Sequence, residues 1–458
     1  MPDDLGGPPD DLGATPDPAA PSGTTGRRFL AVVGRLTAVN VLVRGLSVIT
    51  APLMARALGP EGRGEVAAIM APLMMAAVIG MLGLGQYATR SVARGARPGT
   101  ILGSVGIVLL AIGGLGALAA VPVADFLAED RQTVETFLII GLALLPLSLI
   151  GELLIQMTIG LERWPNMMAA RLIPPATGAI GIVVLYVAGE LTVASFAIVT
   201  IGGSVLQMTP GLIAMIQERD PLRVRPRVVW DGLRFGVKAW ATRLTSSANA
   251  RLDQLLMVRL VSSSELGLYA VGVNAASISS LFTTALVAPL GVRVARGEGD
   301  IVARAVRSTL LMSGAIAVAM AALLPLLLPL LFGSAFDGSV LMAQILLVGS
   351  VPRSAGSVLG SSLVAGGRPG ASAVAQLVGL AVTVPGLLIA VPALGGEGAA
   401  LVSALVGTAI FLTQVRIAGR HFRLGVREML VPRPRDVRWG LDQLPLDRWR
   451  GRLRRAGS

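Results

Sequence analysis

Apolar runs of helical length recur along the chain from Phe29 to Gln414, separated by short polar breaks. The hydrocarbon core of a membrane is about 30 Å thick, and a helix needs about 20 mainly apolar residues to cross it. Twelve segments meet this requirement, and they lie at 30–57, 66–88, 100–124, 135–159, 167–188, 191–216, 236–260, 266–290, 305–332, 338–364, 371–391 and 397–417. The pattern predicts an all-α polytopic membrane protein with about twelve transmembrane helices.

Short identities also recur between the two halves of the chain. Leu53–Leu58 matches Leu256–Val261 at a distance of 203 residues, and Val92–Gly95 recurs as Val294–Gly297 at a distance of 202 residues. Because each half holds an even number of predicted helices, the two repeats should run parallel, related by an axis along the membrane normal. We therefore expect two six-helix lobes related by a parallel pseudo-repeat.

The two ends of the chain differ from the apolar region in composition. The first residues are rich in Pro, Gly and Asp and lack the apolar core of a signal peptide, so they are predicted to be disordered. From Arg416 to Arg455 twelve arginines alternate with Trp439, Trp449 and leucines, which predicts a segment at the interface with anionic lipids rather than a nucleic-acid site. The predicted boundaries are 1–26 for the N-terminal tail, 27–218 for the N-lobe, 219–231 for a cytoplasmic linker loop, 232–417 for the C-lobe and 418–458 for the basic tail.

Charge indicates the orientation in the membrane. Only 14% of the residues are charged, yet 39 basic residues against 27 acidic ones give a net charge of +12. Short cytoplasmic loops of membrane proteins carry excess Lys and Arg, and the arginines gather in alternate loops, at 90–97, 219–234 and 293–307, and in the C-terminal tail. Both termini are therefore predicted to be cytoplasmic.

Three scarce residue types narrow the chemistry. The chain has no cysteine, one histidine and one lysine, so disulfides, thiolate catalysis and cysteine metal sites are excluded. Lys238 does not stand in a phosphate-binding Gly-Lys-Ser/Thr motif, and His421 follows the last apolar run without a partner motif. We expect no enzymatic activity, no cofactor and no metal.

Several motifs carry a family resemblance. Arg56–Gly64 (Arg-Ala-Leu-Gly-Pro-Glu-Gly-Arg-Gly), then Gly83–Gln86 and Thr89–Arg94, resemble the opening of the oligosaccharide flippases of bacterial polysaccharide biosynthesis. Leu252–Leu256 and Glu265–Tyr269 are similar to the family's second half. The family shares a superfamily with the multidrug and toxin extrusion transporters and the lipid II flippases, and the resemblance covers most of residues 29–417.

The resemblance implies a fold and a function. It implies two six-helix lobes around a central cavity, which translocate undecaprenyl-diphosphate-linked oligosaccharides by alternating access across the bacterial cytoplasmic membrane, for surface polysaccharide biosynthesis. The implied partners are the lipid-linked oligosaccharide, membrane lipids with anionic headgroups and polysaccharide assembly proteins. This chain has Arg63-Gly64-Glu65 where the family often has a Gly-x-Tyr motif, so the subfamily and the glycan stay open.

Charged residues within the apolar segments are the candidate functional residues. A charge at the centre of an inserted helix costs about 2.5–3.5 kcal/mol, and four arginines against two acids would leave two positive charges in excess. Guanidinium groups bind phosphate oxygens in pairs, so a diphosphate would suit this excess. The candidate substrate-binding residues are Arg44, Arg243, Arg251, Arg353, Asn40, Asn249, Gln254 and Asn274, and the candidate ion-coupling acids are Asp253 and Glu152.

Structural roles are the alternatives for some of these residues. Arg251 and Asp253 could form a structural ion pair, Arg243 could extend its side chain to the membrane surface, and Glu152 could serve as the partner of a cavity arginine. For the whole protein, an ion-coupled multidrug antiporter of the same architecture is one alternative. A membrane glycosyltransferase or polysaccharide polymerase is another, although the longest predicted outer loop, 125–135, is short for a catalytic site.

Overall fold

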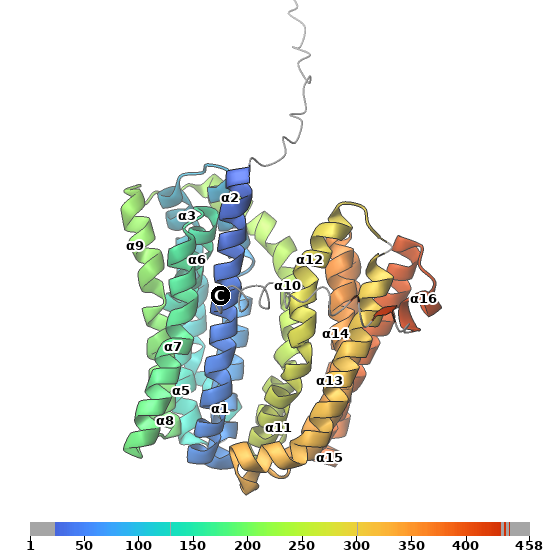
Figure 1. The fold of residues 1–458 in the computed structure, drawn as a ribbon. Helices are drawn as coiled ribbons and strands as arrows, with labels where there is room; N and C mark the ends of the chain where they lie inside the picture. Colours follow the sequence, from blue (N-terminus) through green and yellow to red (C-terminus); the bar gives the residue numbers. More distant parts are fainter. Residues whose placement is uncertain (1–22, 129, 300, 432–434, 437–438, 440–458) are drawn as a thin grey trace, which may run out of the picture.

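The computed structural model describes residues 23–128, 130–299, 301–431, 435–436 and 439. Almost all of these residues are helical, and no strand occurs among them (Figure 1). The two halves of the chain form two groups of helices that lie side by side. The first 22 residues of the predicted N-terminal tail, and residues 440–458 of the predicted basic tail, lie outside the described residues.

The N-lobe consists of the first nine helices, and each of the first six predicted segments is helical. The first helix is broken at Gly59 (φ 67°), between the first two predicted segments, and a 53° bend between the fifth and sixth helices interrupts the fourth segment. The helices are α1 (Gly23–Gly80), α2 (Leu84–Ala93), α3 (Pro98–Leu118), α4 (Ala120–Ala128), α5 (Gln132–Ala143), α6 (Leu145–Gly160), α7 (Trp164–Ala188), α8 (Val193–Leu206) and α9 (Met208–Glu218).

The C-lobe consists of the remaining elements, and its last long helix is divided at Gly395 (φ 54°). The elements are α10 (Pro226–Leu260), α11 (Ser263–Ala276), η1 (Ser277–Ser280), α12 (Leu281–Ala295), α13 (Ile301–Phe332), η2 (Ser334–Phe336), α14 (Ser339–Ala365), α15 (Pro369–Phe422) and α16 (Val426–Leu430). Over the described residues, six helices are long and apolar enough to cross a membrane, or seven if the bent α5–α6 pair is one span. α15 contains two of the predicted segments, and α1 contains the first and most of the second, so the number of helices and the number of spans differ.

Residues with left-handed backbone conformation recur at the spacing of the sequence repeat. Such residues end helices, because a positive φ turns the chain out of the helix. Of the thirteen described residues with positive φ, ten form pairs that lie 202 to 206 residues apart, whereas Gly59, Leu82 and Gly83 have no such partner. The pairs are Gly95 and Gly297, Asp130 and Gly333, Glu162 and Gly367, Gly189 and Gly395, Arg219 and Arg423. The helix connections of the second half thus follow those of the first, which supports the two-lobe arrangement.

The two lobes touch through backbone at one end of the bundle. We call it the junction end; it is the lower end in Figure 1, where α1 is broken at Gly59 and α11 begins. A Cβ atom on Gly64 would lie 1.6 Å from the Ser263 carbonyl oxygen, and one on Gly267 would lie 1.9 Å from the Pro60 carbonyl oxygen. Only glycine at these two positions allows α1 and α11 to approach so closely.

Arginines from both lobes reinforce this contact in a reciprocal pattern. Arg56 of the N-lobe donates from Nε to the Leu331 carbonyl at the end of α13, at 2.9 Å. Arg259, its equivalent in the C-lobe, lies 4.1 Å from the ring centre of Phe126 in α4. Arg131 also crosses the junction, donating to the Val258 carbonyl at 2.8 Å. Each lobe therefore contributes an arginine that contacts a residue near the end of a helix in the other lobe.

The connection between the lobes is attached to the N-lobe. Its non-helical part is 219–225, because α10 begins at Pro226. The Gly99 N–H donates to Asp220 Oδ2 at 2.8 Å, and the Arg225 N–H donates to Ser104 Oγ at 3.0 Å. The predicted loop therefore lies along α3.

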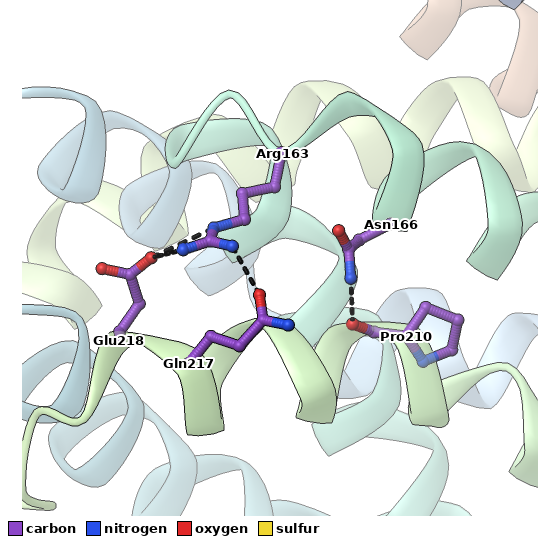
Figure 2. A network of polar contacts seen from close by, with 5 residues as sticks. All are labelled: Arg163, Asn166, Pro210, Gln217 and Glu218. Carbon is purple, nitrogen blue, oxygen red and sulfur yellow. Dashed lines mark hydrogen bonds and ion pairs between the residues drawn. The ribbon is translucent and has the colours of Figure 1, made fainter.

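A polar network fixes the segment that leads into this connection (Figure 2). Arg163, at the start of α7, donates from Nη2 to Glu218 Oε1 at 2.5 Å and from Nη1 to Gln217 Oε1 at 2.6 Å. Asn166 donates to the Pro210 carbonyl at 2.9 Å. These contacts hold both ends of α9 against α7, so the chain reaches α3 from a fixed position.

The first part of the predicted basic tail packs on the C-lobe. Arg307 of α13 binds both carboxylate oxygens of Asp436, at 2.7 and 3.1 Å, and both side chains are buried. Met429 in α16 is fully buried as well. Removing one partner of a buried ion pair destabilises a folded protein strongly, because the other charge is left buried and unpaired. The segment that carries Asp436 is therefore an integral part of the lobe.

The close approach of Gly267 to the Pro60 carbonyl predicts that a methyl group at position 267 destabilises the protein. Gly267→Ala should lower the unfolding free energy by about 1–3 kcal/mol, because the new methyl overlaps the Pro60 carbonyl. Thermal unfolding of the purified protein in detergent measures this change. Gly314→Ala is the control, since nothing lies within 4 Å of that Cβ position, and it should be neutral or slightly stabilising. Equal melting temperatures for the two variants would contradict the close approach.

Candidate functional site

A cavity of about 640 Å³ lies between the N-lobe and α10. Its volume is typical of sites that bind small molecules or parts of larger ones, about 300–1,000 Å³. Much of its lining is apolar, with Met70, Met74 and Met75 of α1 and the following Met81 among the residues, and polar side chains converge on it from other helices. These polar residues are Gln86, Ser148, Glu152, Gln156, Thr200, Ser204, Gln207, Ser247 and Arg251.

One wall of the cavity presents a carboxylate and amides from α2 and α6. Gln156 donates from Nε2 to Glu152 Oε1 at 2.8 Å, one helical turn away, and Thr89 donates to Gln156 Oε1 at 3.2 Å. A Cβ on Gly85 would lie 2.8 Å from Gln156 Cγ, so this glycine lets α2 approach α6. Gln86 Oε1 has no hydrogen-bond partner in the described part of the chain. The wall therefore holds one amide that no protein group satisfies.

Another wall is formed by one face of α10. Trp240, Ser247 and Arg251 all line the cavity, and their spacing of seven and four residues places them on the same side of a helix. Trp240 donates from Nε1 to the Val78 carbonyl at 3.2 Å, which fixes its ring against α1. Arg251 makes no ion pair with any residue that the structure describes. The cavity thus carries a free guanidinium on α10 and a carboxylate on α6.

A second polar group, the C-lobe cluster, consists of Asp253, Tyr269, Arg353 and Ser403. Asp253 Oδ2 accepts hydrogen bonds from the Tyr269 hydroxyl at 2.5 Å and from Ser403 Oγ at 3.0 Å. Arg353 donates to the Ser403 carbonyl at 3.0 Å. Tyr269 is fully buried. The cluster joins α10, α11, α14 and α15, and its residues are not among those that line the cavity.

The structure separates the predicted site residues into groups. Glu152 and Arg251 line the cavity, whereas Asp253 and Arg353 belong to the C-lobe cluster. Arg251 and Asp253 do not form an ion pair with each other.

The remaining candidates lie elsewhere. Asn249 donates to Gln376 of α15, to the carbonyl at 2.7 Å and to Oε1 at 2.9 Å. Asn40 and Asn274 are exposed and Gln254 is half-buried, and none of these four lines the cavity. The side chains of Arg44 and Arg243 lie outside the described residues. Of the candidates whose side chains are described, two thus lie in the cavity, two in the C-lobe cluster and four in neither.

Sequence reasoning missed several polar or aromatic residues of these sites. Gln86, Gln156 and Trp240 line the cavity, and Tyr269 completes the C-lobe cluster. A signal existed for Gln156, which follows Glu152 by one helical turn and so shares its face. Gln86 stands at the end of the recognised Gly-Leu-Gly-Gln motif, but nothing in the sequence indicated that it would line the same cavity as Glu152.

Solved structures with the same architecture are those of flippases and transporters. The chain is similar to the lipid II flippase MurJ in an inward closed conformation, with a TM-score of 0.68 and 15% identity over 84% of this chain and 88% of MurJ. It is also similar to an inward-facing multidrug resistance MATE family transporter of the MOP superfamily, with a TM-score of 0.64 and 14% identity over 82% and 94% of the two chains. These likenesses define the fold as that of a polytopic membrane transporter.

The family follows from the sequence itself. The model of the polysaccharide biosynthesis protein family matches residues 29–290, more than half of the chain. The chain therefore belongs to the polysaccharide biosynthesis protein family, as the motifs indicated, and it is a multi-pass membrane protein. No significant match exists among curated protein sequences.

The C-lobe cluster predicts a specific loss of stability. Tyr269→Phe removes a hydrogen bond to a carboxylate and leaves Asp253 with one donor fewer, so the unfolding free energy should fall by about 1–3 kcal/mol. Thermal unfolding measures the change. Tyr186→Phe makes the same substitution at an exposed position of α7 and should have no measurable effect. If both variants were equally stable, the buried bond would contribute nothing.

Proposed function

We propose that this protein is a flippase that translocates an undecaprenyl-diphosphate-linked oligosaccharide across the bacterial cytoplasmic membrane, by alternating access, for surface polysaccharide biosynthesis. The observation that carries the proposal is Arg251, a guanidinium that lines the cavity and has no counter-ion among the residues that the structure describes, in a member of the polysaccharide biosynthesis family. A free positive charge within a membrane protein is costly. An anionic substrate would offset that cost during transport.

The chemistry of the headgroup suits this cavity. A guanidinium can donate two parallel hydrogen bonds to phosphate oxygens, and the bond is stronger where water is scarce. Arg251 would hold the diphosphate while the prenyl chain stays in the surrounding lipid. Arg243, eight residues earlier on the same helix, would add a second cation along the path, and Arg44 and Arg353 would serve as further contacts as the lobes move.

The contacts between the lobes support alternating access. At the junction end the lobes touch through Gly64, Gly267 and the arginine contacts, all of which can separate without unfolding a helix. We propose that this end faces the outside, because the arginine-rich loops and both termini would then be cytoplasmic. Rocking of the lobes would open the junction end and release the substrate outward.

Energy for the cycle would come from an ion gradient or the membrane potential. Glu152 in the cavity and Asp253 in the C-lobe cluster are the acids we propose for coupling, since each lies at membrane depth among polar donors. The basic tail would bind anionic lipid headgroups, and polysaccharide assembly proteins would receive the product. We propose a transporter without catalytic residues and not an enzyme.

An ion-coupled multidrug antiporter is the second candidate. The fold similarity to a multidrug resistance transporter supports it, as do Glu152, Trp240 and the methionines of the cavity, which would suit an apolar cation. Arg251 opposes it, because a fixed positive charge repels such substrates. Exchange of a cationic dye for protons, without movement of lipid-linked sugar, would favour this candidate.

Removal of the free guanidinium tests the flippase. Arg251→Gln should reduce the rate of flipping at least about tenfold, since a charge-assisted hydrogen bond contributes about 1.5–3 kcal/mol. The assay follows a fluorescent lipid-linked saccharide across the membrane of proteoliposomes. Arg293→Gln is the control: it breaks an exposed ion pair with Glu298, and the rate should not change. Unchanged flipping in Arg251→Gln would remove the main support for the proposal.

A further inference from the structure

The cavity carries opposite charges on two of its walls. Arg251 stands on α10, whereas Glu152 stands on α6, and the two do not neutralise each other by an ion pair. Gln86, Gln156 and Gln207 line the cavity as neutral groups from α2, α6 and the α8–α9 connection. A ligand that fits this lining has an anionic part for Arg251 and an uncharged polar part for the residues around Glu152.

We propose that Glu152, Gln86, Gln156, Gln207 and Trp240 form a sugar subsite for the neutral saccharide attached to the diphosphate. This inference rests on the flippase function proposed above and names the specificity of the same cavity. The chemistry supports a saccharide because amide side chains both donate and accept hydrogen bonds, as sugar hydroxyl groups do. The carboxylate adds an acceptor for two further hydroxyl groups.

Trp240 supplies the second feature of a sugar site. Its indole N–H is bonded to the Val78 carbonyl, so the ring is held in place before any ligand binds. An indole combines a large apolar face with one polar edge. The apolar C–H face of a pyranose ring packs against such a surface, while its hydroxyl groups reach the amides. A preorganised ring costs little entropy on binding.

Glu152 determines whether the subsite accepts a neutral or an acidic saccharide. A carboxylate in the subsite repels an acidic sugar, and like charges at close range act against a wrong ligand. The same repulsion keeps the diphosphate at the Arg251 side of the cavity. The subsite therefore takes a neutral sugar and rejects a uronic acid at the same position.

Binding of three lipid probes to the purified full-length protein tests this subsite. The probes are farnesyl diphosphate, farnesyl diphosphate linked to N-acetylglucosamine, and farnesyl diphosphate linked to glucuronic acid, measured by calorimetric titration. Wild-type protein should bind the neutral-sugar probe about tenfold more tightly than farnesyl diphosphate, a gain of one or two hydrogen bonds. It should bind the glucuronic acid probe no more tightly than farnesyl diphosphate.

Two variants separate recognition of the sugar from recognition of the phosphate. Gln86→Leu removes an amide whose Oε1 atom has no hydrogen-bond partner among the described residues, so folding should be unaffected while the tenfold advantage of the neutral sugar disappears. Glu152→Gln should raise affinity for the glucuronic acid probe about tenfold. Affinity for farnesyl diphosphate should stay within twofold of wild type in Gln86→Leu. Gln132→Leu, at an exposed position of α5, should match wild type for all three probes.

The outcomes distinguish the subsite from the flippase proposal. If the sugar adds no affinity in wild type, or if Gln86→Leu weakens all three probes equally, the subsite is wrong while diphosphate binding stands. If no probe binds, the proposed function and the subsite both fail. Loss of sugar discrimination in Gln86→Leu and of charge discrimination in Glu152→Gln, with Gln132→Leu unchanged, would establish the subsite.

Discussion

The close contact of α1 and α11 through Gly64 and Gly267 is the constraint on which the rest of the structure depends. These two glycines bring backbone against backbone at the junction end, where a side chain of any size would hold the lobes apart. The contact places Arg56, Arg131 and Arg259 within reach of the opposite lobe. With one end joined in this way, the cavity lies farther along the bundle, between the N-lobe and α10.

The long helix α10 belongs to both lobes, and this explains the division of its charges. Its first half packs on the N-lobe, where Trp240 binds the Val78 carbonyl and the Gly236 backbone lies against Gly83. Its second half packs on the C-lobe through Asn249 and Asp253. Arg251 lies in this second half, between Asn249 and Asp253, but it lines the cavity and forms no ion pair with any residue that the structure describes. Because α10 packs on both lobes, a movement of one lobe relative to the other would bend this helix and displace Arg251.

Helical periodicity and the repeat predicted much of this arrangement. The apolar runs predicted the long helices, although not α16, and the repeat predicted equivalent lobes, as the paired left-handed residues support. Glu152 and Arg251 were selected because a charge within a membrane segment is energetically costly and so indicates a functional role. Both residues line the cavity. The same reasoning did not separate Arg353 from Arg251, because each was judged by its depth along one helix and not by the neighbours around it.

Apolar length, charge bias and repeated motifs are local properties of the chain, and they alone determined the fold class, the family and the set of intramembrane charges. Which faces of the helices meet depends on contacts between residues far apart in sequence, and only the tertiary structure decided them. It brought Gln86, Gln156 and Glu152 to one cavity, joined Tyr269 to Asp253, and placed Arg251 in that cavity without an ion-pair partner among the described residues. The physical reason is that periodicity defines the side of one helix, whereas packing between helices, governed here by glycines such as Gly64, Gly85 and Gly267, defines what that side touches.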